Sequence, residues 1–258
     1  MKKEIGEKFK RLIEIMAKLR APDGCPWDRE QTPQSIAPYL LEETYEALEA
    51  IDSGNTRETC EELGDLLLQI VFQSQMADEA KGFDIGNVID AISNKLIHRH
   101  PHVFGESNVS GSEEVLQNWE KLKKKEGKKS LLGGVPKTLP ALLNAFRIGQ
   151  KSSRVGFDWK DAEGVLEKVE EEARELHEAN KSCDKKEIEH EYGDLLLILA
   201  NLGRFLDIDP ESALRKATNR FIKRFNWMEK EIHKCGIEMD KLSTKQWDDL
   251  WEKAKQNL

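Results

Sequence analysis

Apolar residues recur along this chain with the period of an α-helix. The first stripe stands at positions i, i+3, i+4, i+7 and i+10, and its members are Phe9, Leu12, Ile13, Met16 and Leu19. Side chains at this spacing share one face of a helix. No segment alternates apolar and polar residues between turn residues, so the pattern predicts helices throughout and no β-sheet.

Aspartate, proline and glycine mark the expected helix ends. A second helix is expected from about Pro33 to Ile51, before the helix-ending pair Ser53-Gly54. A later helix should begin after Asp84, and its counterpart after Asp209-Pro210, because aspartate is a good N-cap and proline suits the first helical position. Pro101 is expected to truncate the helix that follows Asp84.

Two motifs occur twice, each displaced by 129 positions (194 − 65 and 171 − 42). Glu62-Leu63-Gly64-Asp65 returns as Glu191-Tyr192-Gly193-Asp194. Upstream, Glu42-Glu43-Thr44-Tyr45-Glu46 returns as Glu171-Glu172-Ala173-Arg174-Glu175. Self-similarity at a fixed displacement indicates an internal repeat.

The repeat extends over most of the chain. Trp119 to Lys123, for example, is matched by Trp251 to Lys255. We therefore expect an all-α fold made of two modules with four to five helices each. The modules are placed at residues 1–126 and 137–258, and a Lys/Gly-rich linker at residues 127–136 joins them.

Composition narrows the class of protein. The chain has 258 residues and a net charge of −8, so neither nucleic acid nor an anionic membrane is expected as its main partner. The basic run Lys121 to Lys129 is short, and a solvated helix end with a linker explains it. No stretch of about 18 apolar residues predicts a membrane span. The four cysteines form no CxxC pair and no signal peptide opens the chain, so a reduced, cytoplasmic protein is expected.

Carboxylates gather on single helix faces in both repeats. Residues at i, i+3 and i+4 share a face, so one acidic cluster is expected from Glu171, Glu172 and Glu175, and another from Glu191 and Asp194. The same holds in the first repeat for Glu42, Glu43 and Glu46, and for Glu62 and Asp65.

Solvation explains most glutamate-rich helix faces, but three features favour a site. Asp65 and Asp194 lead directly into leucine-rich helix. Like charges three or four residues apart destabilise a helix unless they are neutralised. The combination also occurs twice in register. Carboxylates crowded on facing helices would have raised pKa values or would need cations.

Ligand type indicates which cation. Oxygen-only ligands suit Mg²⁺, with Mn²⁺ or Ca²⁺ as alternatives. Zinc would need Cys or His at the cluster. A di-iron centre would need Glu-x-x-His on two helices; Glu187 to His190 fits once, but the matching Glu58 to Glu61 lacks the histidine. His98, His100 and His102 have no counterpart in the second repeat and are interpreted as structural or as a basic patch.

A basic face lies on the helix that follows Asp209-Pro210. Lys216, Arg220 and Arg224 stand at i, i+4 and i+8. Such cations either neutralise an acidic site as ion pairs or bind phosphate oxygens that a metal also coordinates. Trp251 and Lys255 share a face as well, which fits a core tryptophan or a base-stacking one. No Gly-rich phosphate loop occurs, so phosphate binding would be metal-mediated.

These motifs together resemble the MazG family of nucleoside triphosphate pyrophosphohydrolases in its two-module form. The resemblance spans essentially the whole chain. It is carried by Cys25-Pro-Trp-Asp28, Tyr39 to Glu46, Glu62 to Asp65, His98 to Phe104, Gly134-Val-Pro-Lys137, Val155 to Trp159, Glu171 to Glu175 and Glu191 to Asp194.

The resemblance implies hydrolysis of nucleoside triphosphates between the α and β phosphates, an all-α fold, a homodimer and a housecleaning role in the nucleotide pool. It implies metal ligation by Glu171, Glu172, Glu175, Glu191 and Asp194. It also implies phosphate contacts by Arg220 and Arg224, and nucleotide contacts by Trp251 and Lys255. Lys95 stands where Arg220 does in the second module, which leaves phosphate binding open in the first.

As a mechanism, two Mg²⁺ ions held by the carboxylates would bridge phosphate oxygens and activate a water. One glutamate of the Glu171–Glu175 motif would serve as general base, and Arg220 and Arg224 would neutralise the departing diphosphate. The second module is favoured as the active one, because its basic face is better formed. The alternatives are a narrower dUTPase or dCTPase-type activity, a catalytically silent nucleotide-binding regulator and a di-iron oxidase.

Overall fold

The computed structural model describes residues 2–105, 107, 109–111, 114–115, 118, 130–236 and 238–257. The basic run Lys121 to Lys129 and Trp119 therefore lie outside the described residues. The chain forms two compact units, Met1–Glu114 and Val115–Leu258. Every regular element in the described ranges is a helix, as the periodicity predicts.

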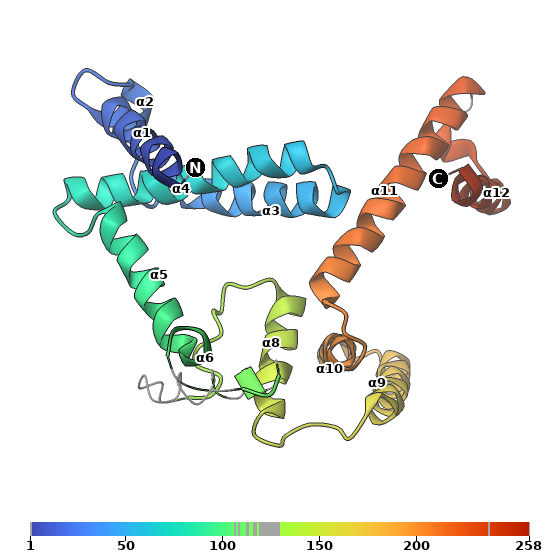
Figure 1. The fold of residues 1–258 in the computed structure, drawn as a ribbon. Coiled ribbons are helices and arrows are strands. Elements are labelled where there is room, and N and C mark those ends of the chain that lie inside the picture. The colour runs from blue at the N-terminus through green and yellow to red at the C-terminus, as the bar shows by residue number, and fades with distance from the viewer. Residues whose placement is uncertain are drawn as a thin grey trace. The chain divides into compact units, whose positions relative to one another are not determined.

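Six helices form the described part of the first unit (Figure 1). Their bounds are α1 Lys2–Arg20, α2 Pro26–Glu30, α3 Ala37–Ser53, α4 Thr56–Glu79, α5 Ile85–Arg99 and α6 Pro101–Phe104. In the second unit the bounds are α8 Ala141–Ser153, α9 Ala162–Ser182, α10 Lys185–Phe205, α11 Pro210–Lys234, the 3₁₀ turn η1 Met239–Lys241 and α12 Thr244–Asn257.

The core of the first unit lies where α1 packs on α4. Met16, Val71, Phe72 and Met76 are buried there, together with Ile36 from the turn before α3. The stripe predicted from the sequence faces this core, since Phe9, Leu12, Ile13 and Leu19 pack against it. Each Å² of apolar surface removed from water contributes about 25 cal/mol to stability, so this packing is the main stabilising term. It holds α4, and through it the α3–α4 pair, in place.

The predicted helix ends are mostly confirmed. Asp84 caps α5 through a reciprocal capping box with Asn87, and Asp209 accepts a hydrogen bond from the Ser212 amide at the start of α11. α3 begins at Ala37 rather than at Pro33. The reason is that the hydroxyls of Thr32 and Ser35 each accept the other's backbone N–H, and these local bonds compete with helix formation.

The second unit repeats the helix pair and extends the helix after it. α9 and α10 pack side by side, α8 packs on α10, and α12 folds back onto α11. α11 has 25 residues whereas α5 has 15, because Pro101 ends the earlier helix. Met228 and Ile232 of α11 are buried, but Phe221 is 54% exposed.

Candidate active site

Two carboxylate triads form where the paired helices face each other. In the first unit Glu43 and Glu46 of α3 meet Glu62 of α4, and each offers an oxygen within 4.8 Å of the others. In the second unit Glu172 and Glu175 of α9 meet Glu191 of α10 within the same limit. We call these the first and second triads. The structure thus brings glutamates of both motifs together in each unit.

Tight turns between the helices set this meeting. In the first unit Gly54 closes α3 in the left-handed region at φ 73°, and Asn55 caps α4 by accepting the amides of Arg57 and Glu58. In the second unit Cys183 takes the left-handed position at φ 59° and Asp184 caps α10. A turn of two residues returns the chain antiparallel, so carboxylates at equal heights face one another.

The first triad carries concentrated negative charge. Burial raises the pKa of the Glu43 carboxyl, and the charges of Asp65 and Glu46 raise it further. Burial and the neighbouring Glu46 likewise raise the pKa of Glu62. Among the described residues, no lysine, arginine or histidine forms an ion pair with any member of this triad.

Gln69 of α4 contacts one member of the first triad. Its side-chain amide donates a 3.5 Å hydrogen bond to Glu43 Oε1, and the residue is only 7% exposed. Its own oxygen, Oε1, is buried and has no hydrogen-bond partner in the described part of the chain. Leaving such an atom unsatisfied costs about 1–3 kcal/mol. Gln69 therefore carries a buried acceptor that a hydrogen-bond donor or a cation would satisfy.

A lysine pairs with one member of the second triad. Lys168 Nζ lies 2.8 Å from Glu172 Oε1 and 2.9 Å from Glu171 Oε1. These bonds, the one to Glu172 first, raise the pKa of the Lys168 ammonium. Glu172 is 5% exposed, whereas the Lys168 side chain is 32% exposed, so a half-buried ammonium forms a charge-assisted hydrogen bond to a buried carboxylate. The corresponding position of the first unit (168 − 129) is Tyr39, which carries no charge.

The remaining predicted carboxylates lie beside the triads. Asp65 is close enough to raise the pKa of Glu43, and Asp194 Oδ2 lies 3.5 Å from His190 Nδ1. Glu171 is engaged by Lys168. Glu42 is exposed on α3. Among the described residues none of these four belongs to a triad itself.

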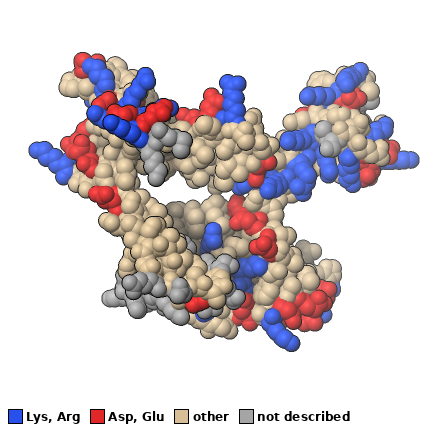
Figure 2. Space-filling view, in the orientation of Figure 1, with Lys and Arg blue, Asp and Glu red and all other residues tan. Residues whose placement is uncertain are grey.

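The basic helix and the tail meet each other. The Arg224 guanidinium carbon lies 5.5 Å from the centre of the Trp251 ring, and Phe221 packs on the same ring at 5.2 Å. Lys255 pairs with Glu252 on its own helix at 2.6 Å. Lys216 and Arg220 lie exposed on α11. Figure 2 shows lysine and arginine side chains gathered over α11 and the adjoining α12.

Comparison with known proteins gives two family matches, one in each half. Residues 31–104 match the MazG nucleotide pyrophosphohydrolase domain, and residues 148–221 match phosphoribosyl-ATP pyrophosphohydrolase. The nucleoside triphosphate pyrophosphohydrolase/pyrophosphatase MazG of Thermotoga maritima is 52% identical over 98% of both chains. The nucleoside triphosphate pyrophosphohydrolase of Escherichia coli K12 is 44% identical over 95% of this chain and 96% of its own.

The chain belongs to the MazG family of nucleoside triphosphate pyrophosphohydrolases. A MazG-related protein of Thermotoga maritima with a solved crystal structure is 29% identical and covers 45% of this chain and 98% of its own, with a TM-score of 0.39. Within the described residues, no helix combines the length and the apolar character that crossing a bilayer requires.

The donor atoms of both triads fit the divalent metal that the MazG family implies. Each triad offers carboxylate oxygens alone, the ligands that Mg²⁺ and Mn²⁺ prefer. Within the described residues the three acids of the first triad have no cation beside them, and the buried oxygen of Gln69 has no hydrogen-bond partner. Both observations fit an added positive charge there. Among the described residues the histidines of the 98–102 segment take no part in a metal-ligand group.

Sequence reasoning missed Lys168 and Gln69. Lys168 stands four residues before Glu172, and this spacing predicts an ion pair on one helix face. The first repeat has Tyr39 at the matching position, so this lysine is not among the residues that the two repeats share. Gln69 stands seven residues after Glu62, two turns along the same face, where its repeat partner is Ile198. In both cases the difference between the repeats was the available signal.

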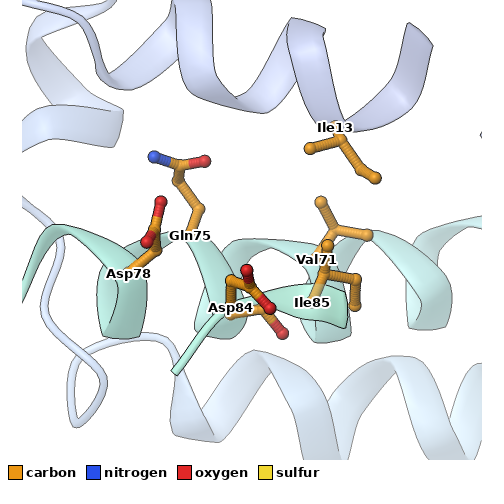
Figure 3. A pocket seen from close by; sticks show the side chains of 7 residues that line it. Ile13, Val71, Gln75, Asp78, Asp84 and Ile85 are labelled. Carbon is orange, nitrogen blue, oxygen red and sulfur yellow. The ribbon is translucent and has the colours of Figure 1, made fainter. Parts of the chain in front are cut away.

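A separate pocket in the first unit does not take part in the site. It has a volume of about 190 Å³ and lies between α1, α4 and the start of α5, and no triad member lines it. Figure 3 shows Asp78, Gln75 and Asp84 at one end and Ile13, Val71 and Ile85 at the other. Asp84 is already engaged in capping α5, so this pocket is an edge of the core.

Proposed function

We propose that this MazG-family protein hydrolyses nucleoside triphosphates to the nucleoside monophosphate and inorganic diphosphate (pyrophosphate). The reaction would use Mg²⁺, and Mn²⁺ could replace it. The second triad carries the proposal. It combines a buried glutamate, two partners within 4.8 Å and a lysine bonded to the same glutamate. The names of the two full-length relatives support the reaction type. We further propose broad specificity for ribo- and deoxynucleotides and a housecleaning role in the cytoplasm.

Metal ions held here would neutralise phosphate charge and lower the pKa of a bound water. Glu172, Glu175, Glu191, Asp194 and Glu171 are the proposed ligands in the second module. A glutamate of α9 that is not needed as a ligand would accept the proton from the attacking water.

Substrate binding is proposed for the basic helix and the tail. Arg220, Arg224 and Lys216 would hold phosphate oxygens, because guanidinium and ammonium groups bind phosphate well. Trp251, already stacked against Arg224, offers a ring face for the base, and Lys255 lies on the same helix. The second module is proposed as the active one, because α11 is ten residues longer than α5 (25 against 15).

In the first module Glu42, Glu43, Glu46, Glu62 and Asp65 are proposed as metal ligands without turnover. We propose module boundaries at residues 1–126 and 137–258 with a linker at 127–136. The net charge of −8 supports a chain whose partners are nucleotides rather than nucleic acid or membrane.

A homodimer is proposed from apolar residues that face solvent on the paired helices. On α10, Tyr192, Leu196 and Leu199 are 55%, 38% and 42% exposed. On α4, Leu63 and Leu67 are 49% and 37% exposed. These positions are spaced by three or four residues, and stripes of this kind are normally covered by another helix. A second copy of the chain would bury them.

Product identity tests the function. The full chain is incubated with Mg²⁺ and a panel of triphosphates that includes dUTP and dCTP, and diphosphate and orthophosphate are assayed separately. Diphosphate with the monophosphate, lost on adding EDTA, is expected across the panel. Orthophosphate with the nucleoside diphosphate would show that the bond between the β and γ phosphates is cut instead. Turnover of dUTP or dCTP alone would replace broad specificity with the narrower activity.

A further inference from the structure

The two triads share a carboxylate framework but differ in what surrounds it. In the second, Lys168 bonds to Glu172 and Glu171. In the first, Tyr39 occupies the lysine position, and no described cation pairs with Glu43, Glu46 or Glu62. The first triad therefore has three converging acids whose charge no protein group compensates within the described residues.

Gln69 is the second difference, and it is independent of the acids. Its side chain is more than nine-tenths buried and its amide end lies at the first triad, 3.5 Å from Glu43 Oε1. Its oxygen has no hydrogen-bond partner among the described residues. The two ends of a glutamine amide are nearly identical in shape, so a half-turn of the amide exchanges its nitrogen for its oxygen. Against a carboxylate alone the nitrogen faces the acid, whereas a cation would draw the oxygen.

Amide oxygens are ordinary ligands of hard cations. Asn and Gln carbonyls join carboxylates around Ca²⁺, and Mg²⁺ or Mn²⁺ sites take oxygen ligands or waters bonded to such oxygens. Ile198 stands at the matching position of the second module (198 − 129 = 69). No comparable oxygen exists there, so the two modules offer different ligand sets.

We propose that Gln69 is a ligand or water-positioning residue of a divalent cation site in the first module, formed with Glu43, Glu46 and Glu62. This site fills without displacing a protein cation, whereas an ion entering the second triad must compete with Lys168. The first site therefore binds the divalent cation independently of nucleotide and keeps it under conditions in which the second is empty. The inference rests on the proposed function only for the choice of metal.

Mn²⁺ is the probe, because its electron paramagnetic resonance signal reports free ion directly. The background is the full chain with Glu175→Gln and Glu191→Gln, which removes two ligands of the second triad and leaves the Lys168–Glu172 pair intact. One class of Mn²⁺ site is expected. Binding is read in protein that lacks the second triad, so the result is independent of whether the chain hydrolyses triphosphates.

Gln69→Met in this background is expected to weaken Mn²⁺ binding about 10-fold or more, the usual loss when a supporting oxygen is removed from a metal site. Gln73→Met is the matched control. It removes an amide one turn along α4, where Gln73 bonds to the Pro33 carbonyl and not to a carboxylate, and Mn²⁺ binding should persist. Glu62→Gln should abolish binding.

Thermal unfolding gives a second readout. Mn²⁺ should raise the melting temperature of the background protein and raise it less in Gln69→Met. Unchanged Mn²⁺ affinity in Gln69→Met overturns the role of Gln69, as does an equal loss in Gln73→Met. Unchanged affinity in Glu62→Gln overturns the site itself. If Gln69→Met does not fold, Gln69→Leu makes the same comparison.

Discussion

The first and second triads share one backbone arrangement but differ in the side chains that surround it. Both place two glutamates of one helix against one glutamate of the next, within 4.8 Å. In the second, Lys168 supplies the countercharge from within the chain. In the first, a buried glutamine lies in contact with Glu43, and no lysine, arginine or histidine of the described residues pairs with the three acids. A duplicated carboxylate framework therefore does not imply two equal sites.

The largest expected effect separates the modules by activity. Glu172→Gln should lower kcat about 10²–10⁴-fold, the range for loss of a catalytic acid or base, while Glu43→Gln should leave diphosphate release near wild type. Glu178→Gln is the control, since it changes the same charge on α9 at an exposed residue paired with Lys181. Loss of activity in Glu43→Gln with retention in Glu172→Gln would place catalysis in the first module.

The lysine can be removed from one module and added to the other. Lys168→Met should lower the free energy of unfolding in EDTA by about 1–3 kcal/mol, because it leaves buried Glu172 without its charged hydrogen bond. Lys181→Met, which breaks an exposed pair with Glu178, should cost about 0–1 kcal/mol. Urea unfolding followed by circular dichroism measures both.

Tyr39→Lys makes the reciprocal change. A lysine at this position can bond to the first triad as Lys168 does to the second, so Mn²⁺ should bind less tightly there and the metal-free protein should be more stable. Equal Mn²⁺ affinity with tyrosine or lysine at position 39 would show that countercharge does not distinguish the two triads.

A smaller effect concerns the C-terminal helix α12 of the second unit, whose counterpart around Trp119 lies outside the described residues. Trp251→Leu should raise KM about 10-fold, as expected when a stacking surface worth 1–3 kcal/mol per base is lost, and should change kcat little. Trp247→Leu is the control, because that ring stacks on Phe225 instead of contacting Arg224. Steady-state kinetics on both variants decides between a nucleotide-contacting and a purely structural tryptophan.

The smallest effect is the pH dependence of folding stability that Glu43 of the first triad causes. The folded state raises the pKa of Glu43 above its ordinary value of 4.5, so the folded protein holds this proton more tightly than the unfolded chain does. Stability is then lost as pH rises from 4.5 through the raised pKa. In EDTA, the free energy of unfolding of wild type should fall relative to that of Glu43→Gln as pH rises over this interval.

Glu79 should give the opposite pH dependence of stability to Glu43. Hydrogen bonding to Arg20 lowers the pKa of Glu79, so its contribution is present above the ordinary value and is lost as pH falls through the lowered one. Wild type should therefore lose stability relative to Glu79→Gln towards acid. Parallel slopes for the two variants would contradict the assignment of charge around the first triad.

Much of this arrangement could be predicted from sequence because local rules govern it. Helix periodicity predicts the apolar face of α1, and the caps at Asp84 and Asp209 follow from side-chain chemistry that acts within three residues. The grouping of carboxylates on shared helix faces follows from their spacing of three and four residues. Each of these depends on spacing along the chain alone.

Other contacts depend on tertiary structure. The contact of Arg224 with Trp251 requires α12 to fold back on α11, and no local spacing encodes that return. The burial of Gln69 depends on how α4 is rotated against α3. The start of α3 was misjudged because hydroxyl bonds between Thr32 and Ser35 compete with the first helical turn.

The short turns at Gly54 and Cys183 also constrain how the two modules can change in length. Glu46 and Glu62 are 16 positions apart, and so are Glu175 and Glu191 (62 − 46 and 191 − 175). One inserted residue in this interval would rotate the following helix by about 100° and carry its glutamate away from the triad.

Length differences are found instead at the far end of the second helix of each pair. α10 has 21 residues against 24 in α4, and the displacement between modules falls from 129 at the helix starts (185 − 56) to 125 at the next helices (210 − 85). Insertions and deletions should thus be tolerated beyond residues 79 and 205 and rejected between the two carboxylate motifs.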